Sequence, residues 1–309
     1  MHFRALKRIV YGCHPKRIER EIECLQKLDG KHHVVPITQV VRQRDCVVLV
    51  LKYFEHEPFQ DYMDDLSMAQ IAAYMYALTD ALAHVHGQGI IHRDIKPTNF
   101  LYHRRHGKFL LVDFGLAQMA GKGGDAGAVR KPAKYKPPAK GPRGRHTLGV
   151  RGYRASADDK RRDLVAARAG TRGFRAPEVL LRCTNQSPAI DMWSMGVILL
   201  TFLSGRSPFF LSNTDTDAIV ELARTFGAKE LQQAAQSVGK EMLIGAGAAQ
   251  SGKDPCPFED PPDLREICER LRSVAPLTTL TAPCFCFACT LAFTVQPGML
   301  NERAQGRWV

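Results

Sequence analysis

The sequence has no long, uninterrupted apolar run and no recognisable signal peptide. Its most apolar late stretch, Leu277 to Val295, contains Pro283 and several threonines and is too weakly apolar to span a membrane. Nine cysteines are scattered along the chain, and their odd number does not suit a complete disulfide framework. We therefore expect no membrane association and a reducing compartment in which the thiols are free.

A second cysteine pair at zinc-site spacing is also missing. Cys284, Cys286 and Cys289 could supply three metal ligands, but phenylalanines separate the sulfur-bearing residues. The sequence therefore favours an incidental cluster of cysteines over a zinc site.

Acidic residues are scarce in one segment. The formal net charge is +12, and fourteen Lys and Arg against four Asp between Met119 and Gly170 account for +10 of it. A basic surface over a whole domain would indicate nucleic acid as the main ligand. A basic insertion in an otherwise balanced domain makes nucleic acid a secondary partner at most.

The same basic segment differs from the rest of the chain in composition. It is rich in Gly, Pro, Ala and Lys and poor in large apolar residues. Such a segment buries too little apolar surface to offset the entropy cost of ordering it. We predict a disordered insertion over residues 119–170.

Hydrophobic periodicity predicts a small β-rich lobe, residues 1–54, and a larger helical lobe, residues 55–118 and 171–272. The expected strands are Phe3–Val10, Val34–Val41, Cys46–Leu51, Phe100–Tyr102 and Phe109–Val112. The expected helices are Pro15 to Gly30, Ser67 to His86, Ile190–Leu203, Asp215–Phe226, Lys229–Leu243 and Asp263–Arg272. Residues 273–309 show no convincing periodicity and are expected to lie outside this fold.

Two short motifs carry the strongest chemical signal. HRDIKPTNF, which runs from His92 to Phe100, is followed by DFG at Asp113 to Gly115, with thirteen residues between Asn99 and Asp113. Either motif alone could be a chance tripeptide in an ordinary loop. Both at this separation, each after an apolar segment, predict a phosphoryl-transfer site.

Each residue type in these motifs suits one need of phosphoryl transfer. Asp94 provides a carboxylate that accepts or positions the proton of the attacking hydroxyl, and Lys96 provides a cation for the γ-phosphate of ATP. Asn99 and Asp113 provide oxygen ligands of the kind that Mg²⁺ prefers. We therefore predict Asp94 and Lys96 as the catalytic pair, with Mg²⁺ bound by Asn99 and Asp113.

A lysine and a glutamate in the small lobe fit the same chemistry. Lys7 lies on the first predicted strand, and Glu21 lies on the helix that follows. A lysine held by a helix glutamate binds the α- and β-phosphates in such sites. The alternative is two solvated charges, and Glu19 and Glu23 on the same helix leave the register open.

A third stretch predicts where a substrate peptide lies. Thr171 and the motif APE, which ends at Glu178, form the segment expected beside Asp94. Lys96 together with Thr171 is typical of serine/threonine specificity. Asp191 starts a very apolar helix and is expected to accept hydrogen bonds from the catalytic-loop backbone, a role compatible with that of an ordinary N-terminal helix carboxylate.

From Ala5 to about Arg272 the sequence resembles the cell division cycle 7-related protein kinases. The resemblance rests on HRDIKPTNFLY, LVDFGLAQ, DLREICERLR and the long stretch AGTRGFRAPEVLLRCTNQSPAIDMWSMGVILLTFLSGRSPFF. Members of that family also carry an insertion after DFG, where residues 119–170 lie in this sequence. The resemblance implies an α+β, bilobal eukaryotic protein-kinase fold and a serine/threonine protein kinase that uses ATP and Mg²⁺.

The resemblance also implies how ATP is held. Its adenine would lie between Ala5 and Leu101, with Leu51 at the back of the pocket. The backbone of Lys52 to Phe54 would form the hinge that hydrogen-bonds the base.

The partners implied by the resemblance are an activating regulatory subunit and, as substrates, subunits of the minichromosome-maintenance helicase in the nucleus. The target Ser/Thr would have acidic surroundings. Arg172 and Arg175 suit an acidic neighbour of the target hydroxyl. The alternative is two surface arginines that contact backbone.

Two features of that family are missing from the sequence. Only six residues precede Lys7, so there is no glycine-rich loop to cover the phosphates, and we expect weak ATP binding and slow turnover. No arginine segment that would pair with Glu178 follows Arg272. Both ends are expected to reflect an incomplete gene model or a fragment with an incomplete small lobe, and a natural truncation is the alternative.

Three function classes stay open on this evidence. The first is a serine/threonine kinase, which retention of the Lys7, Asp94, Asn99 and Asp113 set favours. The second is a non-catalytic scaffold for a regulatory subunit, which the missing loop favours. The third is a DNA- or chromatin-binding module acting through the basic insertion, which holds only two tyrosines to interleave with its charges.

Overall fold

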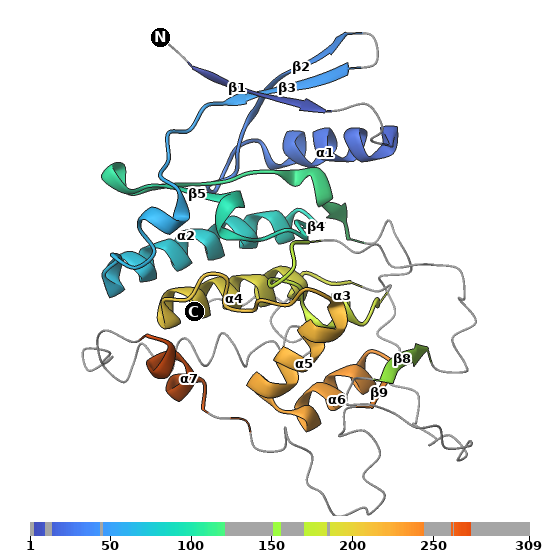
Figure 1. Cartoon of the computed structure of the whole chain (residues 1–309). Coiled ribbons are helices and arrows are strands. Elements are labelled where there is room, and N and C mark those ends of the chain that lie inside the picture. The colour runs from blue at the N-terminus through green and yellow to red at the C-terminus, as the bar shows by residue number, and fades with distance from the viewer. Residues whose placement is uncertain are drawn as a thin grey trace, which may run out of the picture.

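The computed structural model describes residues 3–9, 14–43, 46–120, 151–155, 170–183, 186–243, 261 and 263–272. Two lobes lie one above the other in Figure 1, a small sheet with one helix over a larger and mostly helical part. This arrangement confirms the predicted α+β, bilobal fold.

The small lobe is built on a three-stranded antiparallel sheet with the strand order β1-β3-β2. Its elements are β1 (Arg4–Ile9), α1 (Pro15–Leu28), β2 (Ile37–Gln43) and β3 (Cys46–Lys52). Because side chains alternate along a strand, Ala5, Lys7 and Ile9 share the more buried face of β1. The sheet therefore turns Lys7 away from solvent.

Helix α1 has clear signals at both ends. The His14 ring accepts a hydrogen bond of 3.3 Å from the backbone N–H of Lys16, and a proline occupies the first turn. After the helix, Gly30 has a φ of 63°, and a Cβ there would lie 2.6 Å from the Cβ of Pro36. Glycine is therefore required where the predicted helix stops. The buried residues of α1 are Glu21, Cys24, Leu25 and Leu28.

The large lobe is centred on two apolar helices, α2 (Met68–Gly87) and α4 (Ala189–Ser204). Its strands are β4 (Ile90–Ile91), β5 (Phe100–His103), β6 (Lys108–Leu111), β7 (Gln118–Met119), β8 (Arg151–Ala155) and β9 (Lys240–Leu243). Its other α-helices are α3 (Pro177–Leu180), α5 (Asp215–Phe226), α6 (Ala228–Ser237) and α7 (Leu264–Leu271). Short 3-10 turns are η1 (Phe59–Asp61), η2 (Pro97–Asn99), η3 (Arg104–His106) and η4 (Phe114–Leu116).

Aromatic packing fixes the loop between β4 and β5. Tyr74 of α2 lies 5.0 Å from Phe100 and 5.0 Å from Phe202 of α4, measured between ring centroids. All three rings are fully buried. The loop that carries Asp94 therefore ends on a packed core, as a rigid site requires.

Backbone pairing ties the two lobes together. The N–H of Leu111 donates to the carbonyl of His33 at 2.6 Å, and the N–H of Val35 donates to the carbonyl of Leu111 at 3.0 Å. The strand predicted from Val34 therefore begins only at Ile37, because the residues before it pair with the large lobe.

The helix predicted over Lys229–Leu243 is wrong in its second half. Helix α6 ends at Ser237, Gly239 has a φ of 72°, and β9 follows. Strand β9 pairs with β8, which lies in the segment predicted to be disordered. Except for Met119, Ala120, Gly170 and β8, that segment lies outside the described residues.

Other predictions also fall outside the described part of the chain. The cysteine trio, the apolar run from Leu277 and the tail 273–309 all lie there. Among the described residues, Cys24, Cys46 and Cys183 are free thiols. None of the described helices combines the length and the apolarity that a bilayer crossing needs.

Candidate active site

Asp94 is the centre of a hydrogen-bond network. Its Oδ1 accepts from the backbone N–H and from the hydroxyl of Thr171, at 2.8 Å each. Its Oδ2 accepts from Nδ2 of Asn99 at 3.0 Å and lies 3.0 Å from Nζ of Lys96. Lys96 also donates to the Thr171 hydroxyl at 2.7 Å. The fold thus brings Thr171 to a loop 77 residues earlier in the chain.

Asp191 holds the backbone of the catalytic loop. It is completely buried at the start of α4 and accepts from the backbone N–H groups of His92 and Arg93, at 2.8 and 2.7 Å. The His86 ring of α2 lies 2.9 Å from the same carboxylate. Arg93 has a φ of 70°, a conformation that non-glycine residues seldom adopt. The carboxylate therefore stabilises a strained turn immediately before Asp94.

His92 joins the catalytic loop to the strand that precedes DFG. Its Nε2 donates to the carbonyl of Val112 at 3.1 Å, and its Nδ1 accepts from the backbone N–H of Asp94 at 3.3 Å. These two bonds require the neutral ring with its proton on Nε2. Burial lowers the pKa of His92 and outweighs the opposing effect of Asp191.

Lys7 lies between two carboxylates. Its Nζ is 2.6 Å from Oε1 of Glu21 and 2.5 Å from Oδ1 of Asp113. Burial alone would lower the pKa of Lys7, but its bonds to Asp113 and Glu21 raise it. Partial burial pushes the pKa of Asp113 upward, but Lys7 outweighs it and the pKa is lowered. Lys7 and Asp113 are therefore both charged at neutral pH.

Asn99 and Asp113 fit a hard divalent cation. The carbonyl of Asn99 accepts from the N–H of Val112 at 2.8 Å, which fixes the two residues on adjacent backbone segments. Both side-chain hydrogen bonds that Asn99 makes with described residues use Nδ2, so its Oδ1 is available. Asp113 has a second carboxylate oxygen, Oδ2, in addition to the Oδ1 that binds Lys7. Mg²⁺ takes one or two such oxygens and completes its shell with phosphate and water.

The residues predicted to contact adenine come from β1, β3, β5 and the segment that follows β3. Ala5 of β1 and Leu51 of β3 are directly opposite each other in the antiparallel register. Leu101 of β5 and Phe54 are half-buried against the core, and Lys52, at the end of β3, is exposed. Their contacts with a nucleotide stay a prediction.

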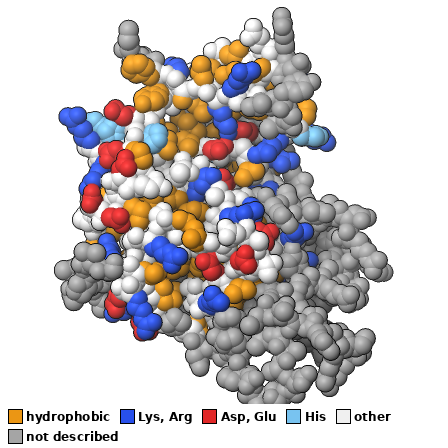
Figure 2. All heavy atoms as spheres, in the orientation of Figure 1, with side chains coloured by type: hydrophobic (Ala, Val, Ile, Leu, Met, Phe, Trp, Pro, Cys, Tyr) orange, Lys and Arg blue, Asp and Glu red, His pale blue; other side chains and the backbone are white. Residues whose placement is uncertain are grey.

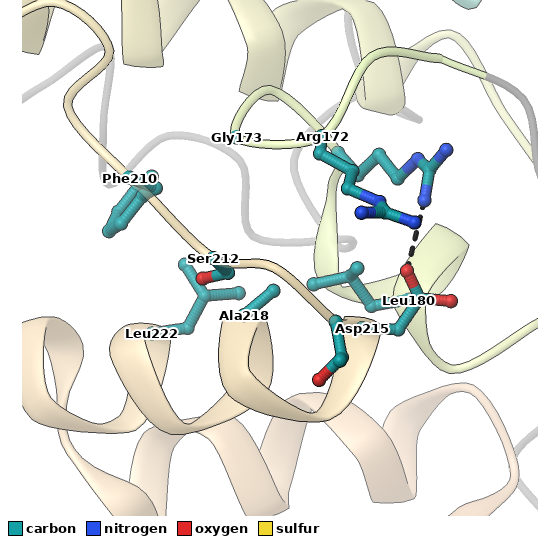
Figure 3. Close-up of a pocket in the computed structure, with 10 residues that line it drawn as sticks. Arg172, Gly173, Leu180, Phe210, Ser212, Asp215, Ala218 and Leu222 are labelled. Carbon is teal, nitrogen blue, oxygen red and sulfur yellow. Dashed lines mark hydrogen bonds and ion pairs between the residues drawn. The ribbon is translucent and has the colours of Figure 1, made fainter.

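A hollow of about 300 Å³, including its open mouth, lies beside the substrate segment (Figure 3). One side of the hollow is apolar and consists of Phe210, Ala218 and Leu222, and Arg172 lines a different side. Arg172 is exposed and donates to the carbonyl of Asn213 at 2.6 Å. The hollow therefore joins the substrate segment to α5.

Arg175 differs from Arg172 in its surroundings. Its side chain is mostly buried and forms an ion pair of 2.9 Å with Asp215 at the start of α5, and it donates to the carbonyl of Gly170. Arg172 therefore has the more accessible charge of the two.

Glu178 lies in α3, and burial raises its pKa. Among the described residues, no Lys or Arg forms an ion pair with it. The arginine partner found in related enzymes has no counterpart in this part of the chain.

Several contacts of the site were not predicted from the sequence. Arg17 of α1 donates from Nε to the carbonyl of Gly115 at 2.6 Å, and Arg93 donates to Gln118 at 2.8 Å. His86 binds Asp191 as described above. Arg17 stands one helical turn before Glu21, but its bond to a backbone carbonyl leaves no residue pattern in the sequence.

Charges of both signs are intermixed over the described surface shown in Figure 2. Lys and Arg side chains alternate there with Asp and Glu. The described part of this face therefore has no patch of a single sign of charge.

Comparison with known families agrees with this geometry. The chain matches the protein kinase domain over residues 4–140 and 152–283. It is 42% identical over 249 residues to probable cell division control protein 7 homolog 2 of Encephalitozoon cuniculi, covering 76% of this chain and 67% of that protein. It is 43% identical over 244 residues to cell cycle protein kinase spo4 of Schizosaccharomyces pombe, covering 76% and 56%. Identity to the cell division cycle 7-related protein kinase of Mus musculus is 31% over 398 residues, covering 90% and 68%.

The fold, the site and these similarities define a protein kinase. Within that class, the chain belongs to the cell division cycle 7-related serine/threonine kinases. It is shorter than these relatives, of which it spans between 56% and 68%. A non-catalytic scaffold and a DNA-binding module find no support in the comparisons.

Proposed function

We propose that this chain transfers the γ-phosphate of ATP to Ser or Thr hydroxyls of proteins, with Asp94 as the residue that receives the hydroxyl proton. The supporting observation is that both oxygens of its carboxylate are held by neighbouring side chains. Thr171 orients one oxygen through two hydrogen bonds, while Lys96 and Asn99 hold the other. A carboxylate fixed in this way needs little reorganisation when it accepts a proton.

The phosphate side of the site has its own residues. Lys7, held by Glu21, would bind the α- and β-phosphates, and Lys96 would offset charge on the γ-phosphate. Asn99 and Asp113 would hold Mg²⁺, which when bound neutralises charge that develops on the transferring group. The backbone from Lys52 to Phe54, with Ala5, Leu51 and Leu101, would hold the adenine.

The test separates proton acceptance from nucleotide binding. Asp94→Asn should abolish transfer to a Ser-containing protein while nucleotide affinity changes little, because Asp94 acts on the hydroxyl and not on the phosphates. Transfer is followed with labelled ATP, and affinity by calorimetry. The assignment fails if the folded variant loses both properties equally.

Partners and location are proposed on the family alone. The relatives are named as cell cycle and cell division kinases. We infer an activating regulatory subunit, replicative helicase subunits as substrates and a nuclear location. Arg172 would read an acidic neighbour of the target hydroxyl, whereas Arg175 would support the segment through its ion pair with Asp215. The basic segment 119–170 would give at most a secondary contact with nucleic acid.

A further inference from the structure

Helix α1 contacts the DFG turn through a residue that has no part in the proposed binding of phosphate. Arg17 donates from Nε to the carbonyl oxygen of Gly115 at 2.6 Å, across 98 residues of sequence. Gly115 is the middle residue of the 3-10 turn Phe114–Leu116, which directly follows Asp113. The turn is therefore bound to the small lobe through its backbone.

Arg17 and Glu21 lie one turn apart on the same face of α1. Glu21 accepts from Lys7, Lys7 reaches Oδ1 of Asp113, and the same oxygen accepts from the N–H of Gly115 at 3.3 Å. With the bond from Arg17 to Gly115, these contacts close a ring that begins and ends on α1. The helix thus holds Asp113 from two sides.

The turn packs closely against the ring. A Cβ built on Gly115 would lie 3.2 Å from Oδ1 of Asp113, 3.3 Å from Oε2 of Glu21 and 3.5 Å from Nζ of Lys7. A small movement of this backbone would therefore change the distances among all three charged groups.

Asp113 itself needs such support. Its φ of 64° is in the left-handed region, which non-glycine residues seldom adopt. Strained residues of this kind persist only where surrounding contacts fix them. A charged donor bound to the next turn is one such contact, because hydrogen bonds from ionised groups are stronger than neutral ones.

We propose that Arg17 is a positioning residue for the metal-binding Asp113, acting through the carbonyl of Gly115. The inference rests on the proposed role of Asp113 as a Mg²⁺ ligand. Arg17 would act on the metal site only through the backbone of Gly115. Partners of a metal ligand outside the coordination shell set its orientation, and their loss weakens metal binding.

The experiment compares three variants of the full chain. Arg17→Met keeps the length of the stem and removes the donor, whereas Arg17→Lys keeps a charged donor. Lys16→Met is the matched control, because Lys16 is the exposed cation next to Arg17 on the same helix. Two quantities are measured: the Mg²⁺ concentration that half-saturates ATP binding, by calorimetry, and hydrogen exchange of the amides of residues 114–117 without nucleotide.

For Arg17→Met we expect roughly a tenfold higher Mg²⁺ requirement, the scale seen when such supporting contacts are removed. Exchange at residues 114–117 should accelerate, and the unfolding temperature should match that of Lys16→Met. Arg17→Lys should restore part of both losses. A merely structural role would lower the unfolding temperature without a selective change in Mg²⁺ requirement.

Two other results would overturn the inference in distinguishable ways. If the wild-type chain needs Mg²⁺ for ATP binding and Arg17→Met has the same requirement, the positioning role is wrong and the metal site stands. If ATP binding of the wild-type chain is independent of Mg²⁺, the metal role of Asp113 fails, and the inference fails with it.

Discussion

Thr171 donates two hydrogen bonds of 2.8 Å to the same carboxylate oxygen of Asp94, one from its backbone and one from its hydroxyl. The hydroxyl also accepts from Lys96 at 2.7 Å. Thr171 therefore connects Asp94, the proposed proton acceptor, with Lys96 of the same loop. Asp94 is therefore oriented only when the segment that carries Thr171 is in place.

Removing this hydroxyl should reduce turnover. Thr171→Val keeps the shape and the backbone bond, but it removes a bond to an ionised group that is worth about 1.5–3 kcal/mol, or a fall in kcat of about tenfold to a hundredfold. The KM for ATP should change little, because none of the hydrogen bonds that Thr171 makes with described residues involves Lys7, Asn99 or Asp113. Thr171→Ser, which restores the hydroxyl, is the control, and steady-state kinetics of both variants check the prediction.

Asp191 should contribute to the free energy of unfolding. Asp191→Asn places an amide among three donors, so at least one buried N–H loses its acceptor, and we expect a loss of about 2–3 kcal/mol in the free energy of unfolding. Urea denaturation measures the effect. Asp61→Asn, at an exposed carboxylate, should change stability by less than about 0.5 kcal/mol. Similar values for the two variants would contradict the assigned role.

The buried ring of His92 should make stability depend on pH. Its folded-state pKa is lowered, so the unfolded chain binds the extra proton first as pH falls below about 6.5. Stability should therefore decrease from pH 7 toward pH 5.5, by at most about 1.4 kcal/mol per pH unit from this group. His92→Gln, which can still donate to Val112, should show a shallower decrease in denaturation at the two pH values. Equal slopes for variant and wild type would show that His92 does not titrate in this range.

Arg172 should determine the preference for an acidic residue beside the target Ser. Arg172→Ala removes an exposed charge at the hollow of Figure 3, and Arg206→Ala removes an exposed arginine that follows α4. The first variant should lose about threefold to tenfold in kcat/KM for a peptide with Glu beside the target Ser. A peptide with Gln at that position should be affected much less, and Arg206→Ala should treat both peptides like the wild type. A loss that is the same for both peptides would exclude recognition of the acidic group.

Arg175→Ala should have a different effect, because its guanidinium is mostly buried and bound to Asp215. Losing that ion pair should lower the free energy of unfolding by about 2–3 kcal/mol. Thermal or urea unfolding of this variant beside Arg172→Ala checks the distinction. A variant as stable as Arg172→Ala would show that the charge of Arg175 is not structural.

Local signals predicted most of the framework. Pro15 and Gly30 mark the ends of α1, Ser67 forms the capping box that starts α2, and the 215–226 helix matches α5 in both bounds. These features depend on residues within a few positions of each other, so a single sequence contains them. The motifs likewise predicted which side chains would be near Asp94.

The errors arise where distant pairing decides the structure. The apolar spacing after Lys229 continues past Ser237, yet Gly239 stops the helix and β9 pairs with β8, which comes about 85 residues earlier. Val34 and Val35 pair with β6 of the other lobe. The contact of Arg17 with a carbonyl has no side-chain pattern to reveal it, because any residue at position 115 would present that oxygen.

The buried carboxylate of Asp191 gives the catalytic loop a direct connection to the centre of the large lobe. It joins α4 to α2 through His86 and to the turn before Asp94 through two backbone N–H groups. Phe202 of α4 is fully buried against Tyr74 of α2, so a change in the packing of these rings would reach the same connection. Residues that contact no substrate therefore help to determine how Asp94 is held.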